Sequence, residues 1–478
     1  MSWLWTSTDM AEAMGGRPLG ALPEGITGIS IDTRTITPGE AFFAIRGESF
    51  DGHDFASAAQ AAGAALIVVA ESKLPALGKL TMPMIVVDDV LAGLVRLGIA
   101  GRDRSNAQII AVTGSVGKTT TKEALRHALS SVGNVHASVA SFNNHWGVPL
   151  TLARMPADTD YGIFEIGMNH PGEIRPLVKL VRPHVAIITR IAPAHLGHFK
   201  NLEEIALAKA EIFEGVVPGG YVLLNRDDRF FKFLEKQARL AGVEHVLSYG
   251  ENARATYRLR SVKLLPECSC LTVRLAGQEV AAKIGAPGRH IVQNVLAVLG
   301  AAHLVGADIA KVSLALSSLT AEAGRGARLR LEHPSGGSFT VIDESYNANP
   351  VSMRAAIDLL ASCQPEGRGR RVAVLGDMLE LGKYSRKLHA DLAEPLMKAG
   401  VNVIFLGGPD MVALKESLPV EFPVEYRQSV NELSPLVLKS VRPGDVLMIK
   451  SSKGIAFSKI VKNLAEKFYA SEPVNPAE

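Results

Sequence analysis

The chain has 478 residues, of which 47% are hydrophobic and 21% are charged, and its formal net charge is +3. This length is too great for one compact core and indicates about three domains. A net charge so close to neutral excludes the basic stripe that steers proteins to nucleic acid, so we expect no nucleic-acid partner.

Cysteine content and hydropathy indicate the cellular compartment. Three cysteines, Cys268, Cys270 and Cys363, cannot build a disulfide framework, and the lone Cys-Ser-Cys lacks the second half of a zinc site. The N-terminus has no basic segment followed by a long apolar run, and no window approaches the roughly 18 uninterrupted apolar residues of a membrane span. We therefore expect a cytoplasmic protein without a signal peptide or membrane span.

In chain order, the sequence divides into three α/β blocks. Residues 1–105 combine short β-rich runs with Ala-rich helical patterns, which is typical of a small α/β unit. Residues 106–325 contain continuous apolar runs between helical segments, which predicts a parallel sheet covered on both faces. Residues 326–478 repeat this pattern and predict a third, Rossmann-like unit, with a hinge in the Gly-rich segment 323–327. The predicted strands are 41–45, 66–69, 84–87, 109–112, 161–166, 185–191, 221–225, 339–342, 372–376, 403–407 and 446–450.

A glycine-rich loop follows the first apolar run of the central block and begins a helical pattern. Its glycines let backbone N–H groups turn inward on phosphate oxygens, and the helix start adds its positive dipole end. Lys118 is expected to reach the β- and γ-phosphates, and the Thr119 hydroxyl suits Mg²⁺. The alternative is a Gly/Ser turn with a surface lysine. We assign the whole loop to a nucleoside triphosphate: Gly114, Ser115, Val116, Gly117, Lys118, Thr119 and Thr120.

Three polar residues lie further along the central block. Glu165 ends the run 161–166, and ligands of open parallel sheets gather beyond the carboxyl ends of strands, so Glu165 is the first candidate Mg²⁺ ligand. Taken alone, it would be an ordinary exposed carboxylate. His195 follows the next run and is either a ligand of a second metal or a packed loop histidine. Lys209 lies in a mostly apolar helical stretch and by itself would be a surface lysine.

Together these motifs resemble the Mur ligase family of ATP-dependent amide-forming enzymes. The resemblance covers nearly the whole chain and rests on the GxxGKTT loop, Glu165 in Glu-Ile-Gly-Met-Asn-His, His195 in Ala-His-Leu, Lys209 in Lys-Ala-Glu-Ile-Phe and Asn294 in Gln-Asn-Val-Leu-Ala. Within the family, residues 343–350 (Asp-Glu-Ser-Tyr-Asn-Ala-Asn-Pro) and 375–382 (Leu-Gly-Asp-Met-Leu-Glu-Leu-Gly) resemble the branch that adds D-alanyl-D-alanine to a UDP-N-acetylmuramoyl-tripeptide.

The resemblance implies a reaction in peptidoglycan precursor synthesis. ATP converts the peptide carboxylate into an acyl phosphate, which the dipeptide amine attacks to give a tetrahedral intermediate. Two Mg²⁺ sites are implied, one held by Thr119 and Glu165 and one supported by His195 and a carbamylated Lys209. The apolar neighbours of Lys209 would favour the neutral amine that a carbamate needs. The expected catalytic residues are Lys118, Glu165, His195 and Lys209.

The remaining binding residues are also implied by the resemblance. Asn294 is expected at the adenine and Asp343 at the ribose. Both Arg325 and Arg328 are candidates for the γ-phosphate, and counting back from the Ser-Tyr-Asn-Ala-Asn motif favours Arg328. The UDP moiety is assigned to Ser30, Thr33, Arg34 and Gly47, the muramoyl peptide to Ser141, Asn143 and Asn144, and the dipeptide to Ser345, Tyr346, Asn347 and Asn349. Asn349 and Pro350 are predicted to begin a helix that continues over 351–361.

The segment Lys450-Ser451-Ser452-Lys453 departs from the Lys-Gly-Ser-Arg that the family commonly carries, which puts an arginine contact there in doubt. Two other functions stay open. A related Mur-type or folylpolyglutamate-type amide ligase would share the central block. A P-loop regulatory NTPase would need an Asn-Lys-x-Asp motif, where this chain has Asn-Arg-Asp-Asp at 225–228. We expect a monomer whose third domain closes on the second.

Overall fold

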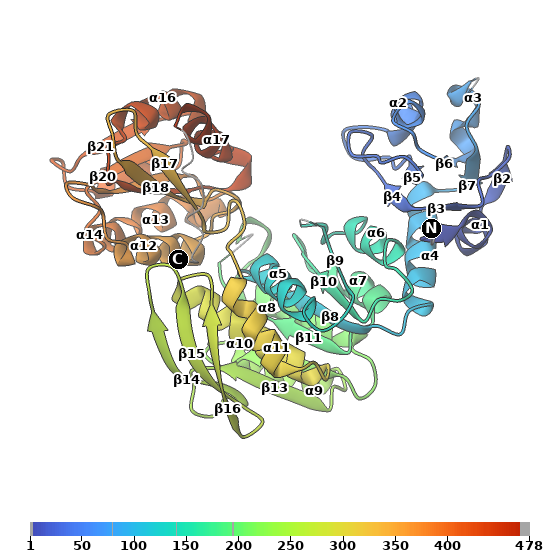
Figure 1. Ribbon diagram of the computed structural model, residues 1–478, viewed down its shortest axis with the longest axis horizontal. Coiled ribbons are helices and arrows are strands. Elements are labelled where there is room, and N and C mark those ends of the chain that lie inside the picture. The colour runs from blue at the N-terminus through green and yellow to red at the C-terminus, as the bar shows by residue number, and fades with distance from the viewer. Residues whose placement is uncertain (1–2, 79, 140, 194–195, 469–478) are drawn as a thin grey trace.

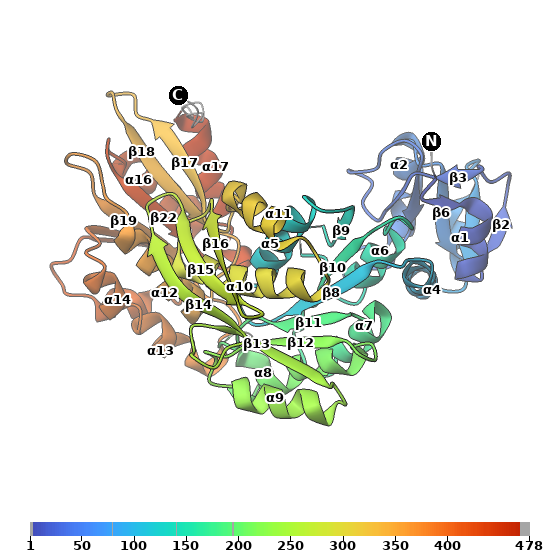
Figure 2. The ribbon, with the colours of Figure 1, turned by 60° about the horizontal axis from the view of Figure 1, so that its bottom comes forward.

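The computed structural model describes residues 3–78, 80–139, 141–193 and 196–468. In these residues the strands form sheets of five, nine and six strands and one two-stranded ribbon, and the three large sheets follow one another along the chain. The first and third sheets lie at opposite ends of the molecule, each against the central part (Figures 1 and 2). The predicted α/β class is confirmed, and we retain 1–105, 106–325 and 326–478 as proposed domain limits.

The first sheet has the order β2-β7-β6-β5-β4. Its parallel strands are β4 (Gly28–Ser30), β5 (Glu40–Phe43), β6 (Leu66–Ala70) and β7 (Met84–Val87), and β2 (Arg17–Leu19) pairs antiparallel to β7. Around it lie α1 (Ser7–Met14), α2 (Ala56–Ala61), α3 (Leu74–Leu77), α4 (Val90–Asp103) and the ribbon of β1 (Trp5–Thr6) and β3 (Gly25–Ile26).

Helix α4 joins the first part to the central one by packing against α6 (Gly147–Ala153). The two helices approach closely because α4 carries glycines at the crossing: a Cβ at Gly101 would lie 2.4 Å from the carbonyl oxygen of Leu152. Leu150 and Ala153 of α6 belong to the same buried cluster as Leu94 of α4 and the strands of the first sheet. The first and central parts therefore share one continuous core.

The central sheet has the order β16-β15-β14-β13-β12-β11-β8-β10-β9. The strands from β9 to β14 run parallel, and β14, β15 and β16 are antiparallel neighbours. Their bounds are β8 (Gln108–Thr113), β9 (Val135–Ala137), β10 (Tyr161–Glu165), β11 (Val185–Ile188), β12 (Tyr221–Asn225), β13 (His245–Gly250), β14 (Tyr257–Leu264), β15 (Ser269–Leu275) and β16 (Gln278–Ile284). The purely parallel sheet was therefore an incomplete prediction.

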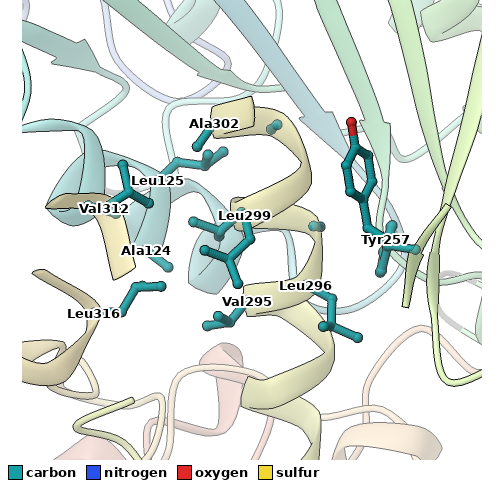
Figure 3. Packing of buried hydrophobic residues seen from close by; sticks show 14 of the residues in the cluster. Ala124, Leu125, Tyr257, Val295, Leu296, Leu299, Ala302, Val312 and Leu316 are labelled. Carbon is teal, nitrogen blue, oxygen red and sulfur yellow. The ribbon is translucent and has the colours of Figure 1, made fainter. Parts of the chain in front are cut away.

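Helices cover both faces of this sheet, as predicted. On one face lie α5 (Lys118–Leu129), α10 (Arg289–Leu304) and α11 (Ile309–Ala315), and on the other α6, α7 (Ile174–Val181), α8 (Leu202–Ala210) and α9 (Phe231–Leu240). Figure 3 shows Leu299 of α10 surrounded by Leu125 of α5 and Val312 of α11, with Tyr257 of β14 beside the helix. This packing fixes α5 and α10 against each other above the strands.

The third sheet has the order β17-β18-β22-β19-β20-β21, with β17 as an antiparallel edge strand. Its strands are β17 (Ala327–Glu332), β18 (Ser338–Glu344), β19 (Arg371–Gly376), β20 (Val403–Gly407), β21 (Val424–Arg427) and β22 (Val446–Lys450). Its helices are α12 (Pro350–Ser362), α13 (Ser385–Ala390), α14 (Ala393–Lys398) and α15 (Val412–Ser417) on one face, and α16 (Val430–Ser440) and α17 (Ser458–Lys467) on the other. Among the described residues, no helix has both the length and the apolar character needed to cross a membrane.

Candidate active site

The glycine-rich loop connects β8 to α5. Gly114 and Gly117 have φ angles of +151° and +85°, which side chains rarely adopt. A Cβ at Gly114 would lie 1.9 Å from Oγ1 of Thr189, so only glycine fits between the loop and the end of β11. Lys118, the first residue of α5, donates from Nζ to the carbonyl oxygen of Gly114 at 2.8 Å. The loop is thus a preformed turn, and the side chain of Lys118 folds back onto the backbone of this turn.

Helix α10 places Asn294 beside the same loop. A Cβ at Gly117 would lie 2.6 Å from Oδ1 of Asn294. The two residues are therefore direct neighbours although they are far apart in the sequence. The hydroxyl of Ser115 is buried and has no hydrogen-bond partner among the described residues. A buried hydroxyl without a partner is costly unless a ligand satisfies it, so Ser115 is available to a phosphate oxygen.

Thr119 and Glu165 meet beside the loop, at the ends of neighbouring elements. Oγ1 of Thr119 donates to Oε2 of Glu165 at 2.8 Å, and Nδ2 of Asn143 donates to Oε1 of Glu165 at 2.7 Å. Glu165 is 1% exposed, so its carboxylate is held on both sides in a nearly dry position. A carboxylate and a hydroxyl are the hard oxygen ligands that Mg²⁺ prefers, and this pair therefore fits the predicted metal.

Lys209 lies near the end of α8 and is 2% exposed. Burial lowers its pKa well below the usual range, and the charge of Lys118 lowers it further. This environment therefore favours the neutral amine of Lys209. His195, the remaining predicted ligand, lies outside the described residues. Within the described residues, no group of three or more His, Cys, Asp or Glu side chains forms a metal site.

The two candidate arginines occupy different places. The guanidinium of Arg325 lies 4.2 Å above the ring of Tyr346, and its charge is among the causes that lower the pKa of Lys118, after burial. Arg328 lies on β17, where its terminal nitrogen contacts Sγ of Cys363 at 3.6 Å, at the C-terminal end of α12. The residue near the phosphate loop is therefore Arg325. The sequence favoured Arg328 because the edge strand β17, which starts at Ala327, was not predicted.

Asp343 is the penultimate residue of β18, which follows the edge strand β17 that was not predicted. Its carboxylate accepts from Oγ of Ser345 at 2.6 Å and from the backbone N–H of Gly324 at 2.7 Å. Asp343 therefore joins the hinge to the Ser345–Asn349 turn. Asn349 is the N-cap of α12, with Pro350 after it, which confirms the predicted helix start.

Lys450 lies behind this turn, 2% exposed, and donates from Nζ to Oε2 of Glu344 and to the carbonyl oxygen of Asn347, both at 3.0 Å. Where the family commonly has arginine, Lys453 places Nζ 5.3 Å from the ring centre of Tyr346. Two cations, Arg325 and Lys453, therefore lie against one tyrosine ring.

Ser141 and Tyr346 were predicted for different substrates, and the structure brings them together. Oη of Tyr346 donates to Oγ of Ser141 at 2.9 Å, from the third part of the chain to the central one. Three residues along the same loop, Oδ1 of Asn144 accepts from the N–H of Gly147, the first residue of α6, at 3.0 Å. The loop predicted for the muramoyl peptide and the turn predicted for the dipeptide are therefore in direct contact.

The residues predicted for UDP lie on the first sheet, away from the phosphate loop. Ser30 ends β4, and its hydroxyl donates to the carbonyl oxygen of Asp32 at 3.0 Å. The exposed Arg34 pairs with Asp32 at 2.6 Å. Gly47 follows β5, which is parallel to β4, so both loops lie at the carboxyl edge of the same sheet.

Two residues of the site, Thr189 and Lys122, were not predicted from the sequence. Thr189 directly follows β11, and its Oγ1 donates to the carbonyl oxygen of Val116 at 2.6 Å in the phosphate loop. Lys122 lies one turn beyond Lys118 and is fully buried. Thr189 could have been predicted, because it is a hydroxyl residue at the end of a strand that neighbours the phosphate loop. Lys122 could not, because nothing in the sequence of a helix indicates that one of its lysines is buried.

Three family models match successive parts of the chain: "Mur ligase family, catalytic domain" over residues 25–100, "Mur ligase middle domain" over 112–302 and "Mur ligase, glutamate ligase domain" over 328–453. A UDP-N-acetylmuramoyl-tripeptide–D-alanyl-D-alanine ligase of Escherichia coli is 32% identical, with 96% of this chain and 98% of that protein aligned. The chain belongs to the Mur ligase family. Members of this family form amide bonds at the expense of ATP, so the predicted family and enzyme class are confirmed.

Solved structures agree with this assignment. A crystal structure of MurF from Acinetobacter baumannii is 29% identical, with a TM-score of 0.82 over 97% of this chain and 99% of that one. The MurF ligase of Thermotoga maritima, solved with ADP, is 22% identical and shares the fold, with a TM-score of 0.75 over 92% of this chain and 97% of that one.

Proposed function

We propose that this Mur ligase joins D-alanyl-D-alanine to a UDP-N-acetylmuramoyl-tripeptide, with ATP converted to ADP and phosphate. The observation that carries the proposal is the hydrogen bond between Ser141 and Tyr346, which unites the loop assigned to the muramoyl peptide with the turn assigned to the dipeptide. The near full-length likeness to ligases named for this reaction supports it.

The first step needs positive charge. A carboxylate does not react with an amine in water because oxide is a poor leaving group, so the carboxylate must first attack the γ-phosphate. Two unit charges about 4 Å apart repel by roughly 4 kcal/mol at an effective dielectric near 20. Lys118, on the phosphate loop, and Arg325, whose charge acts on Lys118, supply cations at this point. We assign the γ-phosphate contact to Arg325 in place of Arg328.

We propose two Mg²⁺ sites. Thr119 and Glu165 would hold the first, and Lys209 as a carbamate, together with His195, would support the second. When bound there, Mg²⁺ would supply positive charge that offsets the phosphate charge. The carbamate forms when the neutral amine of Lys209 attacks CO₂ and loses one proton to water. The lowered pKa of Lys209 supports this step.

The other assignments follow the positions of the residues. We propose Asn294 for the adenine, Asp343 for the ribose and the phosphate loop, including Ser115, for the phosphates. The UDP moiety is proposed at the carboxyl edge of the first sheet. The substrate residues are Ser30, Thr33, Arg34, Gly47, Ser141, Asn143, Asn144, Ser345, Tyr346, Asn347 and Asn349. We propose that the enzyme works as a monomer in the cytoplasm, which the free Cys268, Cys270 and Cys363 support.

The test is ADP release with UDP-N-acetylmuramoyl-tripeptide and ATP, with and without D-alanyl-D-alanine. We expect sustained release and an amide product only when the dipeptide is present. The Lys118→Ala variant should lose on the order of 100-fold or more in kcat, because it lacks the cation at the transferred phosphoryl group. ADP release that ignores both substrates would instead indicate a regulatory NTPase, and use of a single amino acid in place of the dipeptide would indicate a different amide ligase.

A further inference from the structure

Lys122 is a charged residue in the interior that the proposed reaction does not use. It lies on α5 one turn after Lys118, is 0% exposed and donates from Nζ to the carbonyl oxygen of Ser138 at 2.7 Å. It also pairs with Glu123 at 2.6 Å. Burying an ammonium group costs several kcal/mol, so each contact that compensates it is strongly constrained in position.

We propose that Lys122 is a positioning residue for the proposed Mg²⁺ site, acting through Ser138. This inference rests on the proposed function of Glu165 as a metal ligand. Residues adjacent in a helix do not face each other, so the pair with Glu123 does not by itself explain the direction of the Lys122 side chain. The hydrogen bond to the carbonyl oxygen of Ser138, which lies outside the helix, explains the direction of the Lys122 side chain.

Ser138 links Lys122 to the backbone of the metal ligand. Its carbonyl oxygen accepts from Lys122, while its hydroxyl accepts from the backbone N–H of Glu165 at 3.3 Å. Its own N–H donates to the carbonyl oxygen of Ile163 on β10 at 3.2 Å. A shift of Ser138 would therefore move the strand end that carries Glu165.

Asn143 holds the carboxylate of Glu165 by a separate contact. Its amide nitrogen donates to Oε1 of Glu165 at 2.7 Å, which leaves Oε2 directed at Thr119. Its carbonyl oxygen accepts from the N–H of Gly167 at 2.8 Å. A ligating carboxylate is oriented by such outer hydrogen bonds, and their loss typically costs about 10- to 100-fold in metal affinity. Glu165 is thus held at its backbone by Ser138, which Lys122 contacts, and at its carboxylate by Asn143.

The experiment is an equilibrium titration that requires no turnover: binding of ADP to the full-length enzyme at increasing Mg²⁺, measured by calorimetry. Lys122→Met keeps the aliphatic stem and removes the ammonium group. We expect this variant to need about tenfold more Mg²⁺ for the same ADP affinity, while ADP binding without Mg²⁺ stays within twofold. A merely structural role would lower the melting temperature and leave the Mg²⁺ requirement unchanged.

A double-mutant cycle identifies the path. Ser138→Ala alone should also raise the Mg²⁺ requirement, and Lys122→Met added to it should contribute less than a further twofold, because Lys122 acts through Ser138. Full multiplication of the two effects would overturn the proposal. The matched control is Arg126→Met on the same helix: Arg126 pairs with Glu123 but is half-exposed and does not contact Ser138, so the Mg²⁺ requirement should not change.

If Lys122→Met does not fold, Ser138→Ala decides the matter, because it removes only the hydroxyl that accepts from Glu165. A raised Mg²⁺ requirement in that variant supports the proposal, and an unchanged one overturns it. The proposed function fails separately: if the wild-type protein binds ADP without any dependence on Mg²⁺, the metal assignment itself is wrong. If the wild type shows the dependence and both variants match it, only the role of Lys122 is lost.

Discussion

A buried lysine amine without a carboxylate partner has two ways to remain stable: it loses its proton or it gains a negative group. At Lys209, burial and the charge of Lys118 both lower the pKa, so the neutral amine is favoured and reaction with CO₂ becomes feasible. The product is an anion in place of a cation. At the residue scale, the same burial that makes lysine costly prepares it to become a metal-supporting group.

This leads to a prediction for Lys209→Ala. We expect the variant to lose on the order of 100-fold in kcat, because the second metal loses its support, and to regain part of it when formate or acetate is added. ADP release measured against carboxylate concentration checks this. Lys179→Ala, which removes an exposed lysine of α7, should show neither the loss nor the rescue. Full activity of Lys209→Ala without added carboxylate would contradict the carbamate.

Single residues differ in how far the sequence reveals them. The place of Glu165 followed from its position at the end of an apolar run, because neighbouring parallel strands end at the same edge. The choice between Arg325 and Arg328 did not follow, because it depends on where the hinge ends and β17 begins. Lys122 was missed for a different reason: its burial is created by a segment 16 residues away.

At the scale of elements, the loop after β19 is held by polar groups that the reaction does not use. Asp377 is 1% exposed and accepts from the N–H of Met411 at 3.0 Å. His389 on α13 is fully buried, and its Nε2 accepts from the N–H of Met378 at 3.0 Å. Both contacts fix the residues 377–382, whose Glu380 carbonyl oxygen accepts from Gly197 of the central part at 2.8 Å.

Burial raises the pKa of Asp377 to about 6, and the charge of Asp410 also acts in this direction. The native state therefore binds a proton more tightly than the unfolded state, so this carboxyl group contributes stability at low pH that is lost as the pH rises from about 4 through about 6. Asp377→Asn should remove that loss, which is on the order of 3 kcal/mol.

Melting temperatures of wild type and Asp377→Asn between pH 4.5 and 7.5 test this. The melting temperature of Asp377→Asn should rise relative to that of the wild type as the pH increases. The control is Asp391→Asn, a change of an exposed residue in the same part of the chain, whose melting temperature should show the same pH dependence as that of the wild type. A difference between Asp377→Asn and wild type that does not vary with pH would show that Asp377 titrates normally.

Strands differed in how well the sequence revealed them. Most parallel strands, such as β8, β10 and β12, are buried on both faces and appear as continuous apolar runs, so they were predicted. The parallel strands β4, β9, β13 and β21 were missed because they are short or partly exposed. Strands β14, β15, β16 and β17 mix buried with half-buried or exposed positions, and β17 carries Arg328, Arg330 and Glu332. Such edge and antiparallel strands leave one face in water and produce no apolar run. The run at 185–191 was overextended because β11 ends at Ile188, where Thr189 turns toward the phosphate loop.

At the scale of the whole molecule, the two connections of the central part are unlike each other. Toward the first part it shares a buried apolar cluster, reinforced by Trp5, whose Nε1 donates to the carbonyl oxygen of Ala153 at 2.8 Å. Toward the third part, contacts include the hydrogen bonds of Tyr346 with Ser141 and of Gly197 with Glu380. Apolar cores resist opening and single hydrogen bonds do not, so we expect the third part to move.

A double-mutant cycle tests this motion. Tyr346→Phe and Ser141→Ala each remove one partner of the hydrogen bond, and each should weaken the mutual enhancement of muramoyl-substrate and dipeptide binding by about fivefold, or roughly 1 kcal/mol. The double variant should be no weaker than either single one. Small-angle scattering of the wild type should show compaction with an ATP analogue and the UDP-muramoyl substrate, and less compaction for the variants. Additive losses, or scattering unchanged by ligands, would contradict closure through this bond.

The number and order of the blocks could be predicted from the sequence, because strand and helix patterns are local. The meeting of Ser141 with Tyr346 could not, since the two residues are 205 positions apart and neither flanking pattern refers to the other.

The crossing of α4 and α6 has a consequence for the length of substrate that the enzyme accepts. Because Gly98 and Gly101 admit the backbone of α6 and leave no slack, the first sheet cannot slide relative to the phosphate loop. A substrate bound by its nucleotide at the proposed UDP site must then span a fixed distance before its free acid reaches the phosphate loop. We therefore expect peptides one residue shorter or longer to be poor substrates, because two glycines far from the chemistry keep these sites at a constant separation.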